Sequence, residues 1–78
     1  MMWKIRYCGS WNYKPQAESL SAEMEKSGFT VIIEEGDTGQ FELFKKVENH
    51  WVSFMKGGQG EFFTLKDFEE KLGKTVQD

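Results

Sequence analysis

The chain has 78 residues, enough for one small domain, and we expect a single domain over residues 1–78. Its 10 Lys+Arg and 13 Asp+Glu give a formal net charge of −3, and an acidic chain without a basic stripe is a poor nucleic-acid binder. Hydrophobic residues make up 38% of the chain, which argues against disorder. No apolar run approaches the roughly 18 residues of a membrane helix, so the sequence predicts a globular domain with neither nucleic-acid nor membrane partners.

A single cysteine, Cys8, excludes a disulfide framework, and the N-terminus carries charges inside its apolar stretch, unlike a secretion signal. These features predict a cytoplasmic protein in a reducing compartment. Aromatic residues make up 15% of the chain and would fill the core, with one or two phenylalanine rings left at the surface for a partner. No bound cofactor or metal is expected, because the only histidine, His50, has no companion cysteine at ligand spacing.

The first half of the chain predicts a strand, a helix and a second strand. Apolar and charged residues alternate over residues 3–7, as in a strand with one buried face. A helix is predicted over about 14–27, since Pro15 suits its first turn and Gly28 can end it in the left-handed conformation. The apolar run at 29–33 predicts a strand buried on both faces.

The middle of the chain predicts a hairpin between two loops. Residues 34–39 form a polar loop, and short strands at 41–44 and 51–54 are separated by a polar segment at 45–50. A glycine-rich loop follows at residues 56–60.

The last element is a helix with a clear start. Thr64 can cap it, with Asp67 three residues later as the acidic partner of a capping box. Leu65, Phe68 and Leu72 then lie on one face of the helix.

The element order is therefore β-α-β-β-β-α. A strand-helix-strand unit is a right-handed crossover that places its two strands in parallel, and the hairpin extends them into a four-stranded mixed sheet. This predicts an α/β two-layer sandwich. It is the core arrangement of the thioredoxin-like fold, although ferredoxin-like folds use similar parts.

The segment YCGSWNYKP at residues 7–15 resembles the strand-to-helix segment of the selenoprotein W family, which reads Tyr-Cys-Gly-x-(selenocysteine or Cys)-Gly-Tyr-Lys-Pro. The segment TGQFEL at 38–43 is similar to the family's Thr-Gly-x-Phe-Glu-Val segment, and the run from residue 52 through the 56–60 loop resembles its hairpin return. The likeness is collinear over nearly the whole chain. It implies a thioredoxin-like fold and thiol redox chemistry associated with glutathione.

The chain departs from the family pattern at the second redox position, where Trp11 stands, and Asn12 replaces the usual glycine. Because tryptophan cannot form a disulfide, the two-thiol cycle that the resemblance implies is unavailable within one chain. Thioredoxin-like proteins usually place a cis-proline opposite the redox motif. The only proline here is Pro15, so Thr38 and Gly39 would have to supply the facing backbone.

The first functional hypothesis is a monothiol mechanism at Cys8. A cysteine between a strand and a helix N-terminus lies where unpaired N–H groups and partial positive charge favour the thiolate, and Lys14 could add to this. The thiolate would form a mixed disulfide with glutathione or a protein thiol, and a second glutathione would release it. Tyr13, Lys14, Thr38 and Gly39 would shape the site. Whether the chain is an enzyme, such as a glutathione-linked thiol oxidoreductase, stays open.

The second hypothesis is a redox-inactive interaction module in which the Cys8–Trp11 loop docks a protein partner. Free cysteines are often buried and inert, and tryptophan is favoured at interface hot spots. An exposed thiol of low pKa favours the first hypothesis, and a buried unreactive thiol favours the second. Trp11 would cover Cys8, pack against the first helix or face a partner. A further possibility is that the natural protein has cysteine or selenocysteine at this position.

Overall fold

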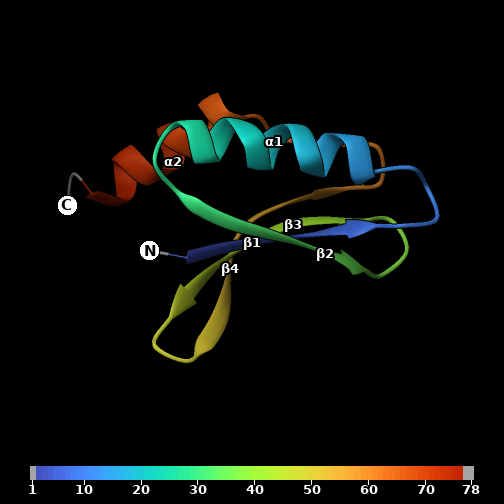
Figure 1. Cartoon of the computed structure of the whole chain (residues 1–78), viewed down its shortest axis with the longest axis horizontal. Coiled ribbons are helices and arrows are strands. Elements are labelled where there is room, and N and C mark those ends of the chain that lie inside the picture. Colours follow the sequence, from blue (N-terminus) through green and yellow to red (C-terminus); the bar gives the residue numbers. More distant parts are fainter. Residues whose placement is uncertain (1, 77–78) are drawn as a thin grey trace.

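The computed structural model describes residues 2–76, with side chains through Gly73. It contains β1 (Met2–Cys8), α1 (Lys14–Lys26), β2 (Thr30–Gly36), β3 (Gln40–Val47), β4 (His50–Gly58) and α2 (Leu65–Val76). The strands form one sheet in the order β2-β1-β3-β4; β1 is parallel to β2, and the other two pairs are antiparallel. Both helices lie on one side of the sheet (Figure 1). The predicted α/β element order and four-stranded mixed sheet are confirmed.

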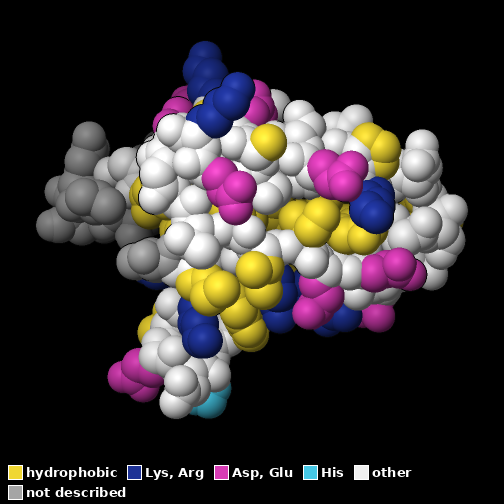
Figure 2. Space-filling model, viewed as in Figure 1, with side chains coloured by type: hydrophobic (Ala, Val, Ile, Leu, Met, Phe, Trp, Pro, Cys, Tyr) yellow, Lys and Arg dark blue, Asp and Glu magenta, His cyan; other side chains and the backbone are white. Residues whose placement is uncertain are grey.

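The core lies between the sheet and the helices and is built around β1. Trp3, Ile5 and Tyr7 alternate into it from this central strand, as their period of two predicts. The Trp3 ring packs edge-to-face against Phe68 at 4.9 Å and against Phe54 at 5.0 Å between ring centroids. Figure 2 shows hydrophobic side chains gathered between the helices and the strands, with charged side chains of both signs around them.

The helix α1 matches its prediction to within one residue. Ala17, Leu20 and Met24 form its buried face, and its first turn contains Pro15. The chain then turns at Gly28, where φ is +97°, a conformation that costs glycine little. Over residues 2–76, no helix combines the length and the apolarity needed to cross a bilayer.

The prediction that the second strand is buried on both faces is wrong. β2 is an edge strand, in which Val31 is buried but Ile32 is 39% exposed. The reason is that both helices cover the same side of the sheet, which leaves the other side open. The strand also continues through Gly36, so the predicted polar loop shrinks to residues 37–39.

The β3–β4 hairpin is longer and its turn tighter than predicted. Residues 45–47 continue β3, and only Glu48 and Asn49 connect the strands, with φ of +56° at Glu48. Cross-strand packing explains the extension, since the ammonium groups of Lys4 and Lys46 lie 4.5 Å and 5.7 Å from the centre of the Trp51 ring. The polar composition of this segment concealed its strand character.

The capping box at the start of α2 is confirmed. The Asp67 backbone N–H donates to Thr64 Oγ1 at 3.2 Å, and the Thr64 N–H donates to Asp67 Oδ2 at 2.9 Å. Two N–H groups at the helix start are satisfied in this reciprocal way.

Replacing Thr64 with alanine is expected to lower the free energy of unfolding by about 1 kcal/mol, because the cap oxygen is lost. Urea denaturation followed by circular dichroism measures the change. Lys66→Ala, on an exposed side chain in the same turn, is the control and is expected to stay within about 0.5 kcal/mol of the parent. Equal stability of the two variants would contradict the role of the cap.

Candidate functional site

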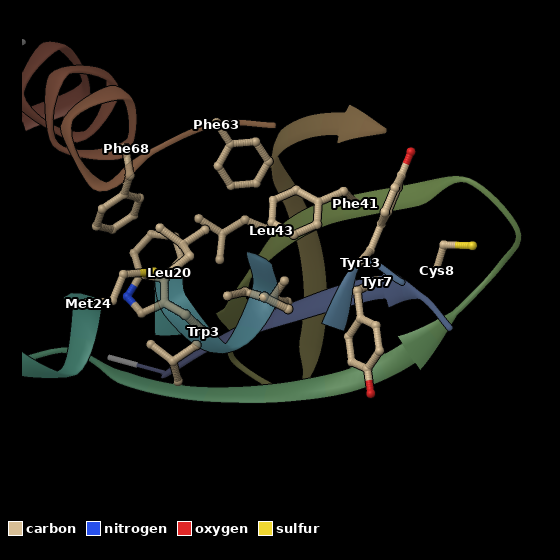
Figure 3. Close-up of a cluster of buried hydrophobic side chains, with 13 residues drawn as sticks. Trp3, Tyr7, Cys8, Tyr13, Leu20, Met24, Phe41, Leu43, Phe63 and Phe68 are labelled. Carbon is tan, nitrogen blue, oxygen red and sulfur yellow. The ribbon is translucent and has the colours of Figure 1, made fainter. Parts of the chain in front are cut away.

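Cys8 is the last residue of β1 and pairs with Gly36 at the end of β2. Its side chain is 0% exposed. Figure 3 shows Cys8 at one end of the buried cluster, with its sulfur directed away from the other labelled side chains. The open thiol that the redox hypothesis expects is therefore not found: the sulfur lies at the rim of the core, under cover.

Hydrogen-bond donors surround the Cys8 sulfur. Burial raises the pKa of the thiol, but hydrogen bonds from the backbones of Gly39, Trp11 and Ser10 and from the Ser10 side chain outweigh burial, and the pKa is lowered from its ordinary value. The donors come from the β1–α1 loop and the β2–β3 turn, whereas α1 begins only at Lys14. The hydrogen bonds that lower the pKa of the thiol therefore come from two converging loops and not from residues within α1.

The β2–β3 turn reaches the thiol because it contains a glycine at position 39. Gly39 is buried, with φ of +78°, and a Cβ there would lie 2.6 Å from Gln59 Nε2 and 3.0 Å from Trp11 Cζ3. The Gln59 backbone N–H donates to the Gly39 carbonyl at 3.1 Å, which ties the turn to the end of β4. Gly39 therefore provides the backbone opposite Cys8, as expected, while Thr38 is exposed beside it.

Trp11 covers the β2–β3 turn. Its ring lies over Gly39 and packs edge-to-face with Tyr13 at 6.0 Å between centroids. The side chain is nevertheless 46% exposed. One part of the indole thus seals the turn that faces Cys8, and the rest is accessible to a partner.

Tyr13 supports the site and does not reach the sulfur. Its hydroxyl accepts a hydrogen bond from the Gly60 N–H at 2.8 Å, and its buried ring packs against Phe41 and Phe62. Lys14 is exposed at the first position of α1 and is not among the groups that lower the pKa of the thiol. Of the predicted site residues, the structure brings Trp11 and Gly39 to Cys8. Tyr13 contacts Trp11 and is not among the groups that hydrogen-bond the sulfur.

A pocket with a volume of about 390 Å³ lies beside Gly39. It is lined by turn residues 37–39, by Gln40 and Glu42 of β3, by Lys56 and Gly57 of β4, and by Gln59. Its volume is within the range of ligand sites, and its lining exposes polar and apolar surface in nearly equal parts.

Sequence reasoning missed Ser10 and most of the pocket. Ser10 could have been found, because a loop that wraps a thiol points its N–H groups inward. The pocket could not, because it depends on a β3–β4 register in which Gln40 pairs with Gly58 and Glu42 with Lys56.

Within the described part of the chain, no group of three or more His, Cys, Asp or Glu side chains is arranged to hold a metal. The single histidine, His50, lies at the tip of the hairpin (Figure 2). Comparison with models of protein families, with curated proteins and with solved structures found no match.

Proposed function

We propose that this chain is a small thiol-redox protein of the selenoprotein W type, in which Cys8 forms mixed disulfides with glutathione or protein partners. The observation that carries the proposal is the convergence of two separate segments on one sulfur. Donors from Ser10, Trp11 and Gly39 stabilise the thiolate, which is the form that attacks a disulfide.

A thioredoxin-like fold is part of this proposal. Support comes from the strand order, which places β1 next to β2 in parallel and next to β3 in antiparallel orientation, with both helices on one side. The candidate thiol is on the last residue of the first strand and precedes the first helix, as in the segment that the sequence resembles. A cytoplasmic location, with its reduced glutathione, suits a protein with one free thiol.

The chemistry is two thiol–disulfide exchanges. The Cys8 thiolate attacks one sulfur of a glutathione-bearing disulfide; a bond forms to that sulfur, the original S–S bond breaks, and the other half leaves as a thiolate. A glutathione thiolate then attacks the mixed disulfide, which restores the Cys8 thiolate and produces oxidised glutathione. No second cysteine of the chain is required.

Access to the sulfur requires movement of the loop that covers it. Residues 9–12 are exposed and lie outside the helices and strands, and Asn12 has φ of +60°, which is uncommon for a residue other than glycine. Opening of this short loop would expose the thiol without disturbing the core, since the sulfur is at the rim of the cluster.

The test is the pH dependence of Cys8 alkylation by iodoacetamide. The alkylation rate is expected to fall as the pH is lowered. Because the pKa of Cys8 is lowered in the folded chain, the midpoint of this fall is expected at a lower pH than in the same chain unfolded in urea, where a thiol titrates at roughly pH 8.5. By linkage, the thiolate contributes to folding stability above the unfolded-state pKa, and this contribution is lost as the pH falls through the folded-state pKa. Mass spectrometry after exposure to oxidised glutathione is expected to show one adduct in the parent and none in Cys8→Ser.

A second candidate function is the redox-inactive interaction module. Two aromatic side chains favour it, because Trp11 is 46% exposed and Phe62 is 39% exposed, and both pack on Tyr13. A Cys8 that reacts only after unfolding would contradict the redox proposal and leave this one.

A further inference from the structure

The sheet has two edge strands, and β2 is the less protected of them (Figure 1). At the other edge, a register shift interrupts the β3–β4 ladder, Lys71 Nζ donates to the Phe54 carbonyl, and Gly58 forms a bridge with Glu61. Such features keep a strand edge from pairing with another chain. By contrast, Thr30–Gly36 forms backbone hydrogen bonds only with β1 within the described part of the chain. The outer backbone groups of β2 are therefore available to a further strand.

The two glutamates near the end of β2 do not guard this edge, because both turn back toward β1. Glu34 Oε2 lies 3.0 Å from Arg6 Nε and 3.5 Å from Lys4 Nζ, and both cations are on β1. The Glu35 carboxyl lies over Gly9, the residue that follows β1. Charged side chains on an edge strand ordinarily oppose pairing with another strand. Here the two carboxylates are directed across the sheet, away from the open edge.

The side-chain pattern of β2 is complementary to a second copy of itself. Antiparallel pairing centred on Ile32 places Ile32 opposite its counterpart and Val31 opposite Ile33, and β-branched residues form favourable cross-strand pairs. It also covers the Ile32 side chain, which is 39% exposed. In this register Glu34 lies opposite Thr30, so the acidic segments are at opposite ends of the pair. Parallel pairing would place them side by side, and charge therefore selects the antiparallel orientation.

We propose that the chain forms a two-fold symmetric dimer in which β2 pairs antiparallel with β2 of a second copy, joining the two sheets into one. Because the paired residues share a face, the helices of both copies lie on the same side of the joined sheet. Cys8 is on β1 and takes no part in the pairing, so the proposed dimer does not depend on the thiol chemistry.

Sedimentation equilibrium of the reduced chain tests the association. The parent is expected to approach twice its mass of 9.1 kDa as the concentration rises. Ile32→Lys places two ammonium groups opposite each other on the two-fold axis and is expected to raise the dimer Kd about tenfold or more. Val52→Lys adds the same charge at an exposed apolar residue of β4 and is expected to keep the parent Kd. Equal Kd values in the two variants would overturn the proposal. A parent that stays monomeric at millimolar concentration would also overturn it and leave the edge to a strand of another protein.

A disulfide test reports the register and does not depend on how Ile32→Lys folds. The double variant Cys8→Ser/Ile32→Cys carries one thiol on the two-fold axis, where opposite Cα atoms of antiparallel strands are about 4.5 to 5.5 Å apart, within reach of a disulfide. Mild oxidation is expected to give a covalent dimer rapidly, as followed by non-reducing gel electrophoresis. Cys8→Ser/Val52→Cys carries one exposed thiol on β4 and is expected to cross-link more slowly, through random collisions. Equal cross-linking rates would overturn pairing through β2.

Discussion

Trp11→Cys is expected to form an internal disulfide with Cys8. The backbone of residue 11 already hydrogen-bonds the Cys8 sulfur, so the two positions are close, as the bridge requires Cα atoms less than about 7 Å apart. Treatment with oxidised glutathione is expected to lower the number of free thiols in this variant from two to none, as measured with Ellman's reagent under denaturing conditions. The circular dichroism spectrum is expected to be unchanged, because the Trp11 side chain is only partly buried.

Trp11→Ser is the matched control, since it removes the same indole and adds no thiol. It is expected to retain one cysteine, reactive or glutathione-bound, and never an internal bridge. A Trp11→Cys chain that stays folded but accumulates only glutathione adducts would contradict the loop geometry. A bridged product would also give direct weight to the possibility that cysteine or selenocysteine is the natural residue at this position.

Phe68→Ala is expected to have the largest effect on stability, a loss of about 3 to 5 kcal/mol in the free energy of unfolding. Phe68 is fully buried and packs its ring against Trp3, Phe29 and Phe54, so it anchors α2 to the sheet. A domain of this size has a total stability of about 5 to 15 kcal/mol, so this loss is a large share of it. Urea denaturation, with the midpoint and slope compared, measures the change.

Phe62→Ala is the control for removing a phenylalanine ring. Phe62 is partly exposed and packs on Tyr13 and Phe41 at the surface, so the expected loss is about 1 to 2 kcal/mol. Equal losses in the two variants would show that α2 does not depend on Phe68 for its docking.

The order of elements could be predicted from the sequence because local signals mark it. Gly28 ends α1 through its own backbone freedom, and Thr64 with Asp67 starts α2 through hydrogen bonds three residues apart. The alternation in residues 3–7 identifies the face of β1 that is buried. None of these signals depends on distant parts of the chain.

The exposure of β2 and the surroundings of Cys8 depend on distant parts of the chain and could not be predicted. The apolar run in β2 does not reveal that both helices cover one side of the sheet, which leaves Ile32 exposed. The burial of Cys8 and the donors around it depend on the approach of Gly39, 31 positions later in the chain. The pairing of Cys8 with glutathione chemistry stays a prediction from the resemblance.

The direction of β1 has a practical consequence for handling the protein. This strand runs through the middle of the sheet from Met2 to Cys8, so its two ends are separated by roughly 20 Å at about 3.3 Å per residue. A tag or tether attached ahead of β1 would extend from the end of the molecule that is opposite to the Cys8 loop. Molecules immobilised in this way would all present the loop and its neighbouring pocket to the medium, an orientation suited to surface-based capture assays.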